Sequence, residues 1–483
     1  MRLVVVGYGM AGARLAAEVH GRRPDLDVTV LGAEPHRAYN RILLSHVVAG
    51  TSPEADVYLT EPAGRGVRVR LGQAAAGVDR ANRTVTTADG TAVGYDTLVL
   101  ATGAEAVLPP IKGLTLDDGS LPDRVAALRT LDDCRRILEL SDRAVGAGAA
   151  PSALVLGGGL LGLEAARGLA RRGLACTVLH PQGHLMDRQL DPAAGAVLAS
   201  TLDGLGVRTV MDASTVAVES GPERVEAVLC DGRRLSADLL VVACGVRART
   251  GLAERAGLGV DRGILVDDRL RTTDRHIYAI GDCAQHAGTV SGLVAPAWEQ
   301  ARVVADVVTA ARPLARYVPR PVITRLKAPG IDLASMGDST GTDGDVITFA
   351  DPARGTYAKL VVRDDRLAGA ILLGDNPTVG AVIQLFDRGA RLPADPRSLL
   401  LGRAIGAAAA AGGASEASPA LMPDAAVICQ CNTVTKGALV RCWRGGARSA
   451  PDLIAGTRAG TGCGGCRAAV DGIAGWLHNE GAA

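Results

Sequence analysis

At the start of the chain, the pattern of hydrophobic and polar residues changes from a short apolar stretch to a helical repeat and back to a short, largely apolar stretch. Residues 3–6 are a continuous apolar run, residues 10–19 follow a helical pattern, and residues 27–31 are a second short stretch rich in β-branched residues. Short apolar runs rich in β-branched residues predict buried strands, and the longer period between them predicts a helix. The first part of the chain therefore predicts a strand–helix–strand unit of an α/β protein.

Three glycines lie between the first predicted strand and its helix. Gly7 permits a tight turn, Gly9 lets the backbone approach a pyrophosphate, and Gly12 allows the helix to pack closely on the strand. The helix N-terminus offers N–H groups and a positive dipole end to phosphates. Glu34 follows the second strand, where a carboxylate can accept hydrogen bonds from ribose hydroxyls. This order predicts a dinucleotide-binding site, and the alternative is an ordinary strand-to-helix turn.

The same pattern recurs in the middle of the chain, with Gly157, Gly159 and Gly162. Two fingerprints predict either two bound dinucleotides or a duplicated fold in which one site has been lost. The second strand of this unit ends in His180 instead of an acid, which weakens the ribose argument. No arginine follows closely to bind a 2′-phosphate, so the sequence favours NADH over NADPH.

Composition limits the classes of function. A chain of 483 residues predicts about three domains. With 52 basic and 51 acidic side chains, the net charge of +1 argues against nucleic-acid and anionic-membrane partners, as does the aromatic content of 2%. No run of eighteen apolar residues predicts a membrane span, and the first strand is needed for the fold, so we expect a cytoplasmic protein without a signal peptide. Clustered cysteines are then expected to be metal ligands or redox groups.

Two further segments carry a family resemblance. "YDTLVLATGAEAVLPP" and "HIYAIGDCA" each predict a strand that enters a turn of small residues. With the two fingerprints, they resemble the two-dinucleotide-binding-domain flavoproteins of the glutathione-reductase-like class. The resemblance implies FAD at the first fingerprint, NAD(P)H at the second, a ribityl-binding Asp282, and Glu164 near the contact of flavin and nicotinamide, unless Glu164 is simply a solvated helix residue. The residues that complete the FAD site by this resemblance are Ala101, Thr102, Gly103, Gly281 and Asp282.

A redox-active cysteine pair is missing from the expected region. Residues 36–50 contain no cysteine, and we predict that Cys244 and Cys283 are buried small side chains, which disfavours a dithiol mechanism. "AYNRILLS" instead resembles a segment of rubredoxin-reductase-like and nitrite-reductase flavin modules. That resemblance implies that Arg41 points toward the isoalloxazine, where a positive charge eases hydride uptake. The alternative is a surface arginine paired with a neighbour.

The C-terminal part contains four cysteines in a metal-binding pattern. Cys429 and Cys431 form C-x-C, and Cys463 and Cys466 form C-x2-C after thirty-one residues. Four thiolates suit Zn²⁺ or an iron–sulfur cluster, and glycine N–H groups in the second loop can bond to cluster sulfides. The segment resembles the bacterioferritin-associated-ferredoxin type of [2Fe-2S] domain, with zinc or an empty dithiol site as alternatives. Cys442, inside a predicted helix, is expected to be a core residue.

The domain order can now be predicted. Residues 293–301 resemble the helix start that packs over the flavin ring, and the small-residue segment before the cysteines is expected to be a flexible linker spanning roughly 25 Å. The fold class is α/β, with two Rossmann-like domains, an α+β interface domain that forms a lid, and a small helical [2Fe-2S] domain. The predicted bounds are 1–113 and 240–315 for the FAD-binding domain, 114–239 for the NAD(P)H-binding domain, 316–402 for the interface domain, 403–424 for the linker, and 425–483 for the [2Fe-2S] domain.

This order resembles the N-terminal part of the large subunit of NADH-dependent assimilatory nitrite reductases. The sequence ends at Ala483, so we expect no sirohaem-binding region, and the remaining resemblance is to the electron-transfer subunits of assimilatory nitrate reductases. Flavin can accept an electron pair from NADH and release single electrons, which an iron–sulfur cluster carries one at a time. The expected partner is a separate acceptor, favoured to be a molybdenum-containing nitrate reductase catalytic subunit. The alternatives are a ferredoxin-reductase-like donor to a nitrite reductase or an oxygenase, and a redox- or iron-sensing binding protein.

Overall fold

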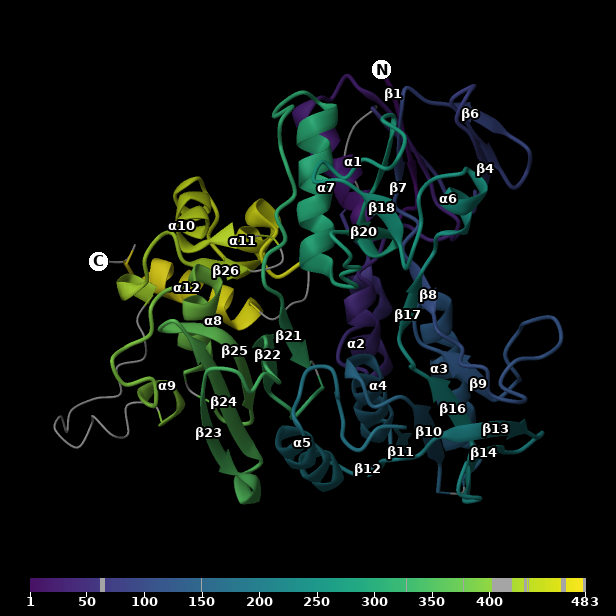
Figure 1. The fold of residues 1–483 in the computed structure, drawn as a ribbon, viewed down its shortest axis with the longest axis vertical. Helices are drawn as coiled ribbons and strands as arrows, with labels where there is room; N and C mark the ends of the chain where they lie inside the picture. Colours follow the sequence, from purple (N-terminus) through teal and green to yellow (C-terminus); the bar gives the residue numbers. More distant parts are fainter. Residues whose placement is uncertain are drawn as a thin grey trace.

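The computed structural model places two α/β domains one above the other in Figure 1, with a third domain and a small C-terminal module along one side. The described residues are 1–60, 66–148, 150–326, 328–376, 378–401, 419–429, 432, 434–461 and 466–480. The predicted linker, 403–424, therefore lies outside the described residues as far as position 418. We call residues 419–480 the C-terminal module.

Five parallel strands form the first sheet in the order β19-β7-β1-β2-β3. Their bounds are β1 (Arg2–Val6), β2 (Asp27–Leu31), β3 (Val67–Arg70), β7 (Thr97–Leu100) and β19 (Ile277–Ala279). Helices α1 (Met10–Arg22) and α7 (Val294–Val308) run side by side and pack on one face of this sheet (Figure 1). Their buried side chains share one cluster with Val28 and Val30 of β2.

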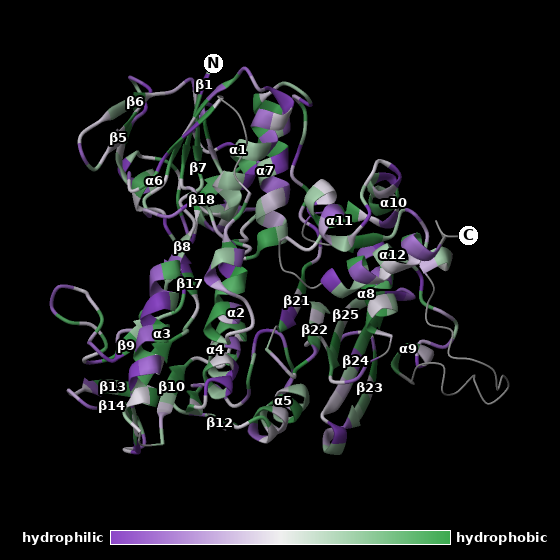
Figure 2. Cartoon of the chain, turned by 180° about the vertical axis from the view of Figure 1, so that it is seen from behind, coloured by the Kyte–Doolittle hydropathy of each residue, from purple (hydrophilic) through white to green (hydrophobic). Residues whose placement is uncertain are grey.

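Smaller elements cover the other face of the first sheet. An antiparallel sheet of β4 (Ala75–Asp79), β5 (Thr84–Thr87) and β6 (Ala92–Gly94) packs there with α6 (Gly251–Arg255). Strand β18 (Ile264–Val266) pairs in parallel with β20 (Ala284–His286). Figure 2 shows that the central strands are hydrophobic, whereas α3 and α7 carry both hydrophilic and hydrophobic stretches.

The second sheet repeats the first, with five parallel strands in the order β12-β11-β10-β16-β9. Its strands are β9 (Val125–Ala127), β10 (Ser152–Leu156), β11 (Ala175–Leu179), β12 (Val207–Val210) and β16 (Leu239–Val242). Its helices are α3 (Leu131–Gly146), α4 (Leu160–Arg171) and α5 (Pro192–Gly204). An antiparallel sheet of β13 (Thr215–Ser220), β14 (Val225–Leu229) and β15 (Arg234–Ala237) packs on the opposite face.

The return to the first domain comes later than residue 240. Strand β16 pairs in register with β10, from Ala153↔Leu239 to Leu156↔Val242, so these residues belong to the second sheet. The two crossings between the domains then run side by side as antiparallel strands, β8 (Ala104–Ala106) and β17 (Val246–Ala248). The short helix α2 (Leu44–Val48) of the first domain packs against α4 of the second.

The third domain is an antiparallel sheet in the order β21-β22-β25-β24-β23. Its elements are β21 (Ile323–Leu326), β22 (Leu333–Gly337), β23 (Asp345–Asp351), β24 (Thr356–Arg363), β25 (Arg366–Leu373), α8 (Val379–Arg388) and α9 (Ser398–Leu401). Helix α8 covers the sheet with Val382 and Phe386. Asp191 at the start of α5 accepts a hydrogen bond from Tyr357 of β24 at 2.8 Å, which joins the third domain to the second.

The C-terminal module is a small hairpin with three helices. Its elements are β26 (Val427–Cys429), β27 (Val434–Thr435), α10 (Lys436–Arg444), α11 (Ala450–Thr457) and α12 (Arg467–Glu480). Its buried core includes Met10 of α1 and Trp298 of α7, so the module packs directly on the first domain (Figure 1). The remaining short elements are the 3₁₀ turns η1 (Arg41–Leu43), η2 (Glu54–Val57), η3 (Gly281–Cys283), η4 (Pro352–Arg354) and η7 (Pro419–Leu421). Within the described ranges, no helix is both long and apolar enough to cross a bilayer.

Candidate functional site

One cavity of about 460 Å³ lies where the first and second domains meet. It brings together residues that are far apart in the sequence and that the sequence analysis had singled out. These lining residues are Gly7, Gly9, Glu34, Arg41, Ala101, Thr102, Gly103, Glu164, Gly281 and Asp282. Gly12 lies behind this lining, and Gly157, Gly159, Gly162 and His180 belong to the second fingerprint away from this wall.

The first glycine turn has the geometry that its sequence predicts. Gly7 has φ +111°, and a Cβ atom there would lie 2.1 Å from the carbonyl oxygen of Ala101. A Cβ on Gly12 would lie 2.0 Å from the carbonyl oxygen of Gly7, so this glycine allows α1 to pack against the strand end. Gly9 precedes α1, and the atom nearest to a Cβ there is the Arg41 side chain, at 4.0 Å. The N-terminus of α1 therefore opens into the cavity beside a cation.

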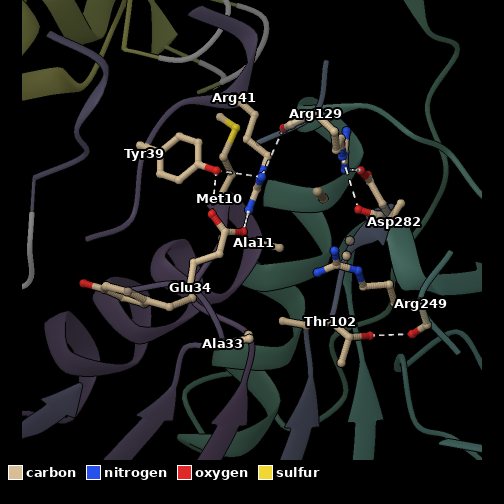
Figure 3. A pocket seen from close by; sticks show the side chains of 18 of the residues that line it. Met10, Ala11, Ala33, Glu34, Tyr39, Arg41, Thr102, Arg129, Arg249 and Asp282 are labelled. Atoms are coloured by element: carbon tan, nitrogen blue, oxygen red, sulfur yellow. Dashed lines mark hydrogen bonds and ion pairs between the residues drawn. The ribbon is translucent and has the colours of Figure 1, made fainter. Parts of the chain in front are cut away.

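A half-buried polar network lines the cavity at the end of β2. Tyr39 donates a hydrogen bond from its hydroxyl to Glu34 at 2.6 Å, and Arg41 donates to both Glu34 and the Tyr39 hydroxyl (Figure 3). Burial raises the pKa of Glu34, but the Arg41 charge and the hydrogen bonds from Tyr39 and Arg41 lower it more, so the net pKa lies below the ordinary value. Burial chiefly raises the pKa of the Tyr39 phenol. At neutral pH this network holds an ionised carboxylate beside a neutral phenol.

Arg129 forms a second ion pair across the cavity and was not singled out from the sequence. Its guanidinium lies 2.7 Å from Asp282, and its backbone carbonyl accepts a hydrogen bond from Arg41 (Figure 3). Arg129 immediately precedes the capping box of α3, in which the Thr130 side chain accepts from the backbone of Asp133 and the Asp133 side chain accepts from the backbone of Thr130. The sequence "RTLDD" contains that capping box, so the start of α3 could have been predicted from the sequence. The ion pair of Arg129 with Asp282 could not, because the two residues are far apart along the chain.

Three guanidinium groups lie around the cavity, and two of them are paired with carboxylates, Arg41 with Glu34 and Arg129 with Asp282. Arg41, Arg129 and Arg249 all line it, and Thr102 donates a hydrogen bond from its hydroxyl to the carbonyl of Arg249 at 2.7 Å (Figure 3). Guanidinium groups together with a helix N-terminus are the usual protein partners of a diphosphate. The residues present consequently fit the pyrophosphate of a dinucleotide.

The second fingerprint contributes Glu164 to the cavity and turns His180 away from it. Glu164, 8% exposed on α4, lines the cavity with two leucines of the same helix. The ring of His180 is 6% exposed, its Nδ1 accepts a hydrogen bond from the backbone of Gly158, and its Nε2 lies 3.2 Å from Asp187. Burial chiefly lowers the pKa of His180, so the ring is neutral near pH 7. His180, expected among the cofactor-binding residues, instead packs beneath the glycine turn.

Two of the four expected metal ligands lie in the described part of the C-terminal module. Cys429 is 2% exposed and Cys466 is 9% exposed, and a hydrogen bond from the Cys466 thiol chiefly lowers the pKa of Cys429. The side-chain amide of Asn432 donates to the Cys429 sulfur at 3.8 Å. A thiolate with an amide donor suits an iron–sulfur cluster or zinc. Cys431 and Cys463 lie outside the described residues.

The cavity and the cysteine core share a wall. The side chains of Met10, Ile42 and Val294 line the cavity and also pack in the hydrophobic cluster that contains Cys429 and Cys466. We call these three residues the shared wall. The side-chain amide of Asn40, next to this wall, donates to the carbonyl of Thr461 in the second cysteine loop at 2.9 Å. The hydrophobic cluster that contains Cys429 and Cys466 thus reaches the wall of the cavity.

Three other cysteines were singled out from the sequence as buried or core residues. Cys283 is fully buried after Asp282, as expected, but Cys244 is exposed, because its strand has already ended at Val242 where the chain leaves the second sheet. Cys442 is half-buried on α10 and packs against the core of the C-terminal module. Neither Cys244 nor Cys283 lines the cavity.

Three family models match consecutive parts of the chain. The model for pyridine nucleotide-disulphide oxidoreductases matches residues 1–306. The model for the rubredoxin NAD⁺ reductase C-terminal domain matches residues 321–384, and the model for the BFD-like [2Fe-2S] binding domain matches residues 427–475. The cofactors expected from the sequence, FAD, NAD(P)H and [2Fe-2S], are therefore confirmed at the family level.

Curated relatives match nearly the whole chain. The NAD(P)H nitrite reductase of Bacillus subtilis is 35% identical over 479 residues, which cover 98% of this chain and 57% of that protein. The assimilatory nitrate reductase electron transfer subunit of the same organism is 34% identical over 491 residues, which cover 99% of this chain and 60% of that protein. The chain spans a little more than half the length of these relatives.

Solved structures share the fold. Putidaredoxin reductase, in its covalent complex with putidaredoxin, is 25% identical with a TM-score of 0.72, over 85% of this chain and 99% of that chain. The ferredoxin reductase for the CYP199A2 system of Rhodopseudomonas palustris is 25% identical with a TM-score of 0.73, over 85% of this chain and 100% of that chain. The predicted α/β class with two Rossmann-like domains is confirmed. The chain belongs to the pyridine nucleotide-disulphide oxidoreductase family and is an NAD(P)H-dependent flavin oxidoreductase with a BFD-like [2Fe-2S] domain.

Proposed function

We propose that this protein oxidises NADH and passes the electrons through FAD and the [2Fe-2S] cluster to a separate acceptor subunit. The observation that carries this proposal is the shared wall of Met10, Ile42 and Val294, because these three side chains line the cavity and also pack in the hydrophobic cluster that contains Cys429 and Cys466. FAD supplies the ability to accept two electrons together and release them singly, and the cluster carries one at a time. The arrangement supports the C-terminal module as the exit for electrons.

Different residues of the chain are proposed to bind different parts of FAD. We assign the diphosphate to the N-terminus of α1 with Arg41 and Arg129, the adenosine ribose to Glu34, and the ribityl chain to Asp282. The resemblance implied that Arg41 points toward the isoalloxazine. Its position next to Gly9 and Glu34 instead favours a contact with the diphosphate. Ionised Glu34 supports ribose binding because a carboxylate accepts hydrogen bonds from two hydroxyls.

We assign the meeting point of nicotinamide and flavin to the part of the cavity that Glu164 lines. Helix α4 begins at the second glycine turn, and its residues Leu160, Leu161 and Glu164 reach the cavity that contains the first turn. The two dinucleotides would then approach each other from the two domains. The apolar leucines would help to exclude water there, which strengthens the electrostatic interactions around the two rings and limits side reactions of the reduced flavin.

Neutral His180 supports NADH as the electron donor. A 2′-phosphate on NADPH needs a positive partner at the end of the second strand, and the ring of His180 is buried, neutral and hydrogen-bonded to Gly158. NADH needs no such cation. We therefore expect a lower KM for NADH than for NADPH, with little difference in kcat.

The favoured acceptor is the molybdenum-containing catalytic subunit of an assimilatory nitrate reductase. Support comes from the relative of Bacillus subtilis whose name is assimilatory nitrate reductase electron transfer subunit, which matches 99% of this chain. The similarity to ferredoxin reductases supports a second candidate, a donor to a nitrite reductase or an oxygenase. The two candidates differ only in the acceptor, so the acceptor assay decides between them.

An anaerobic NADH titration of the purified holoprotein tests the electron route. We expect flavin bleaching together with the EPR signal of a reduced [2Fe-2S] cluster. Cys466→Ser should abolish the cluster signal and keep flavin bleaching, and Cys442→Ser, in the same module but outside the ligand pattern, should keep both. Zinc in place of iron in the wild-type protein would contradict the proposal.

The acceptor is tested by adding purified catalytic subunits to the NADH-reduced protein. We expect NADH-dependent nitrate reduction with a molybdenum nitrate reductase subunit, and its loss in Cys466→Ser. Transfer only to a nitrite reductase or an oxygenase component would replace the favoured acceptor by the second candidate. Slow reduction of every acceptor, including ferricyanide, would instead support a sensing protein.

A further inference from the structure

Arg14 lies buried between the first domain and the C-terminal module. Its side chain is 10% exposed, and its guanidinium stacks over the ring of Trp298 of α7 at 5.2 Å. Trp298 is itself 3% exposed and donates its indole N–H to the carbonyl of Met10 at 3.1 Å. Arg14 is therefore held from two helices of the first domain at the point where the module docks.

Arg14 contacts the cysteine core through one side chain of the module. Its Nη1 donates a hydrogen bond to Oδ1 of Asn432 at 2.8 Å. The two N–H groups of the Asn432 amide face the opposite way and are shared among three acceptors, the carbonyl of Arg458, the Thr461 hydroxyl at 3.2 Å and the sulfur of Cys429 at 3.8 Å. An arginine can only donate, so the bond from Arg14 forces the amide oxygen toward α1 and the amide N–H₂ group toward the cysteine sulfur.

The charge on Arg14 is retained in this buried position. Burial lowers the pKa of Arg14 to about 10, which leaves the guanidinium positive at neutral pH. Glu18 lies 2.7 Å from Arg14 but also pairs with Arg22 at 2.6 Å and Arg458 at 3.6 Å. Glu18 is thus shared among three guanidinium groups, of which Arg22 also pairs with Asp306, so these five side chains together carry a net positive charge.

We propose that Arg14 is a positioning residue that raises the reduction potential of the [2Fe-2S] cluster, by orienting the Asn432 amide toward Cys429 and by placing a buried positive charge beside it. The inference rests on the proposed function, in which the cluster accepts one electron at a time. Reduction adds one electron and hence one negative charge to the cluster. A donor N–H on a ligand sulfur and a nearby cation stabilise that added charge.

The residue acts across the interface between domains. Arg14 belongs to the helix whose N-terminus opens into the FAD cavity, whereas Asn432 belongs to the cluster loop. The cluster reaches its raised potential only when the module is docked. Electrons from the cavity then have a favourable destination in the docked arrangement.

An EPR-monitored redox titration of the holoprotein, with mediators and dithionite, tests the inference. In Arg14→Met we expect the ratio of reduced to oxidised cluster at the wild-type midpoint to fall about tenfold, which is about 59 mV for one electron. Arg14→Lys should restore part of the ratio because it keeps the charge. Asn432→Leu should shift the ratio in the same direction, and its combination with Arg14→Met should add less than the sum.

The matched control is Arg22→Gln, which removes the same charge from the same helix at a residue paired with Glu18 and Asp306. We expect its ratio to change less than twofold, with FAD content and iron content equal to wild type in every variant. An unchanged cluster midpoint in Arg14→Met, or loss of iron without a shift, would overturn the inference. Because mediators reduce the cluster without NADH, an Arg14-dependent shift in a protein whose cluster NADH cannot reduce would refute the proposed function and leave the inference standing.

Discussion

Gly7 shows how a single backbone position can be constrained twice. Its φ of +111° strains any residue with a Cβ, and that atom would meet the carbonyl of Ala101 at 2.1 Å. Both facts follow from a turn that brings β1, α1 and the end of β7 to one point. The glycine spacing in the sequence is sufficient to predict this turn, because few other arrangements require three glycines there.

Gly7→Ala should lower the free energy of unfolding by about 1–3 kcal/mol and reduce the FAD bound per polypeptide. Urea denaturation and flavin absorbance measure the two effects. The control is Gly21→Ala in α1, where a Cβ would meet no atom within 4 Å, so stability should rise by about 0.5–1 kcal/mol with full FAD content. Equal FAD content in both variants would contradict the turn's role.

His180 illustrates a residue whose surroundings the sequence could not predict. It was expected among the cofactor-binding residues although a histidine there weakens the ribose argument, and in the structure its ring nitrogens bond to Gly158 and approach Asp187. Burial chiefly lowers its pKa from the ordinary 6.5, so protonation favours the unfolded state. Its contribution to stability is therefore complete above pH 6.5 and is lost as the pH falls through the folded-state pKa.

The pH dependence of stability checks this residue. Between pH 7.5 and pH 5.5 the thermal midpoint of the wild-type protein should fall more than that of His180→Leu, which lacks the titrating ring. The variant should be less stable than wild type at pH 7.5, because the Gly158 N–H loses its acceptor. Parallel curves for the two proteins would show that His180 titrates alike in the folded and unfolded states.

At the scale of elements, α3 links a local signal to the cavity. Its capping box holds Thr130 and Asp133, and the Asp133 side chain also accepts from the backbone of Arg129. The cap therefore sets the direction from which Arg129 reaches Asp282. The capping box could be recognised in the sequence. The partner of Arg129, Asp282, lies 153 positions away, and only the fold brings these two residues together.

Thr130→Ala should reduce the free energy of unfolding by about 1 kcal/mol and weaken FAD binding severalfold. The first effect comes from the lost cap, and the second from a less well positioned Arg129. Denaturation and reconstitution of the apoprotein with FAD measure them. Ser449→Ala removes an equivalent cap from α11, where Ser449 accepts from the backbone of Asp452, and should cost similar stability while leaving FAD affinity unchanged. A loss of affinity in both variants would indicate general destabilisation.

At the scale of the whole molecule, the C-terminal module docks through a mixed apolar and charged surface. Met10 and Trp298 contribute the apolar part, and Arg14 and Glu18 contribute the charged part. All three tryptophans of the sequence, Trp298, Trp443 and Trp476, lie in this one cluster. Tryptophan fluorescence therefore reports on the module and its interface.

We expect urea to change tryptophan fluorescence at a lower concentration than it releases FAD, because a small module with its own core separates before the large domains unfold. Flavin absorbance and far-UV circular dichroism follow the second transition. Arg14→Met should move the first transition to lower urea and leave the second in place. Coincident transitions of all three signals would show that the module and the flavin domains unfold as one unit.

Local patterns determined much of this protein. Several motifs could be recognised in the sequence because each depends on neighbours a few residues away. They are the two glycine turns, Glu34, the two small-residue turns around Thr102 and Asp282, and the C-x-C and C-x2-C pairs. The α/β class and the cofactors followed from them and from the family resemblance, and both are confirmed. The domain boundary expected between residues 239 and 240 was less accurate, because β16 crosses it and belongs to the second sheet.

Only the tertiary structure decided which groups meet. Arg129 faces Asp282, His180 turns inward, Arg41 joins Glu34, and Arg14 reaches Asn432 across more than four hundred positions. Such pairs form because packing of helices on sheets brings distant side chains together. Burial then strengthens the electrostatic attraction between their charges and the hydrogen bonds that they make. Periodicity and spacing describe one stretch of chain at a time, so they carry no information about a partner on another element. The contact between the cavity wall and the hydrophobic cluster that contains Cys429 and Cys466 was likewise decided by the tertiary structure.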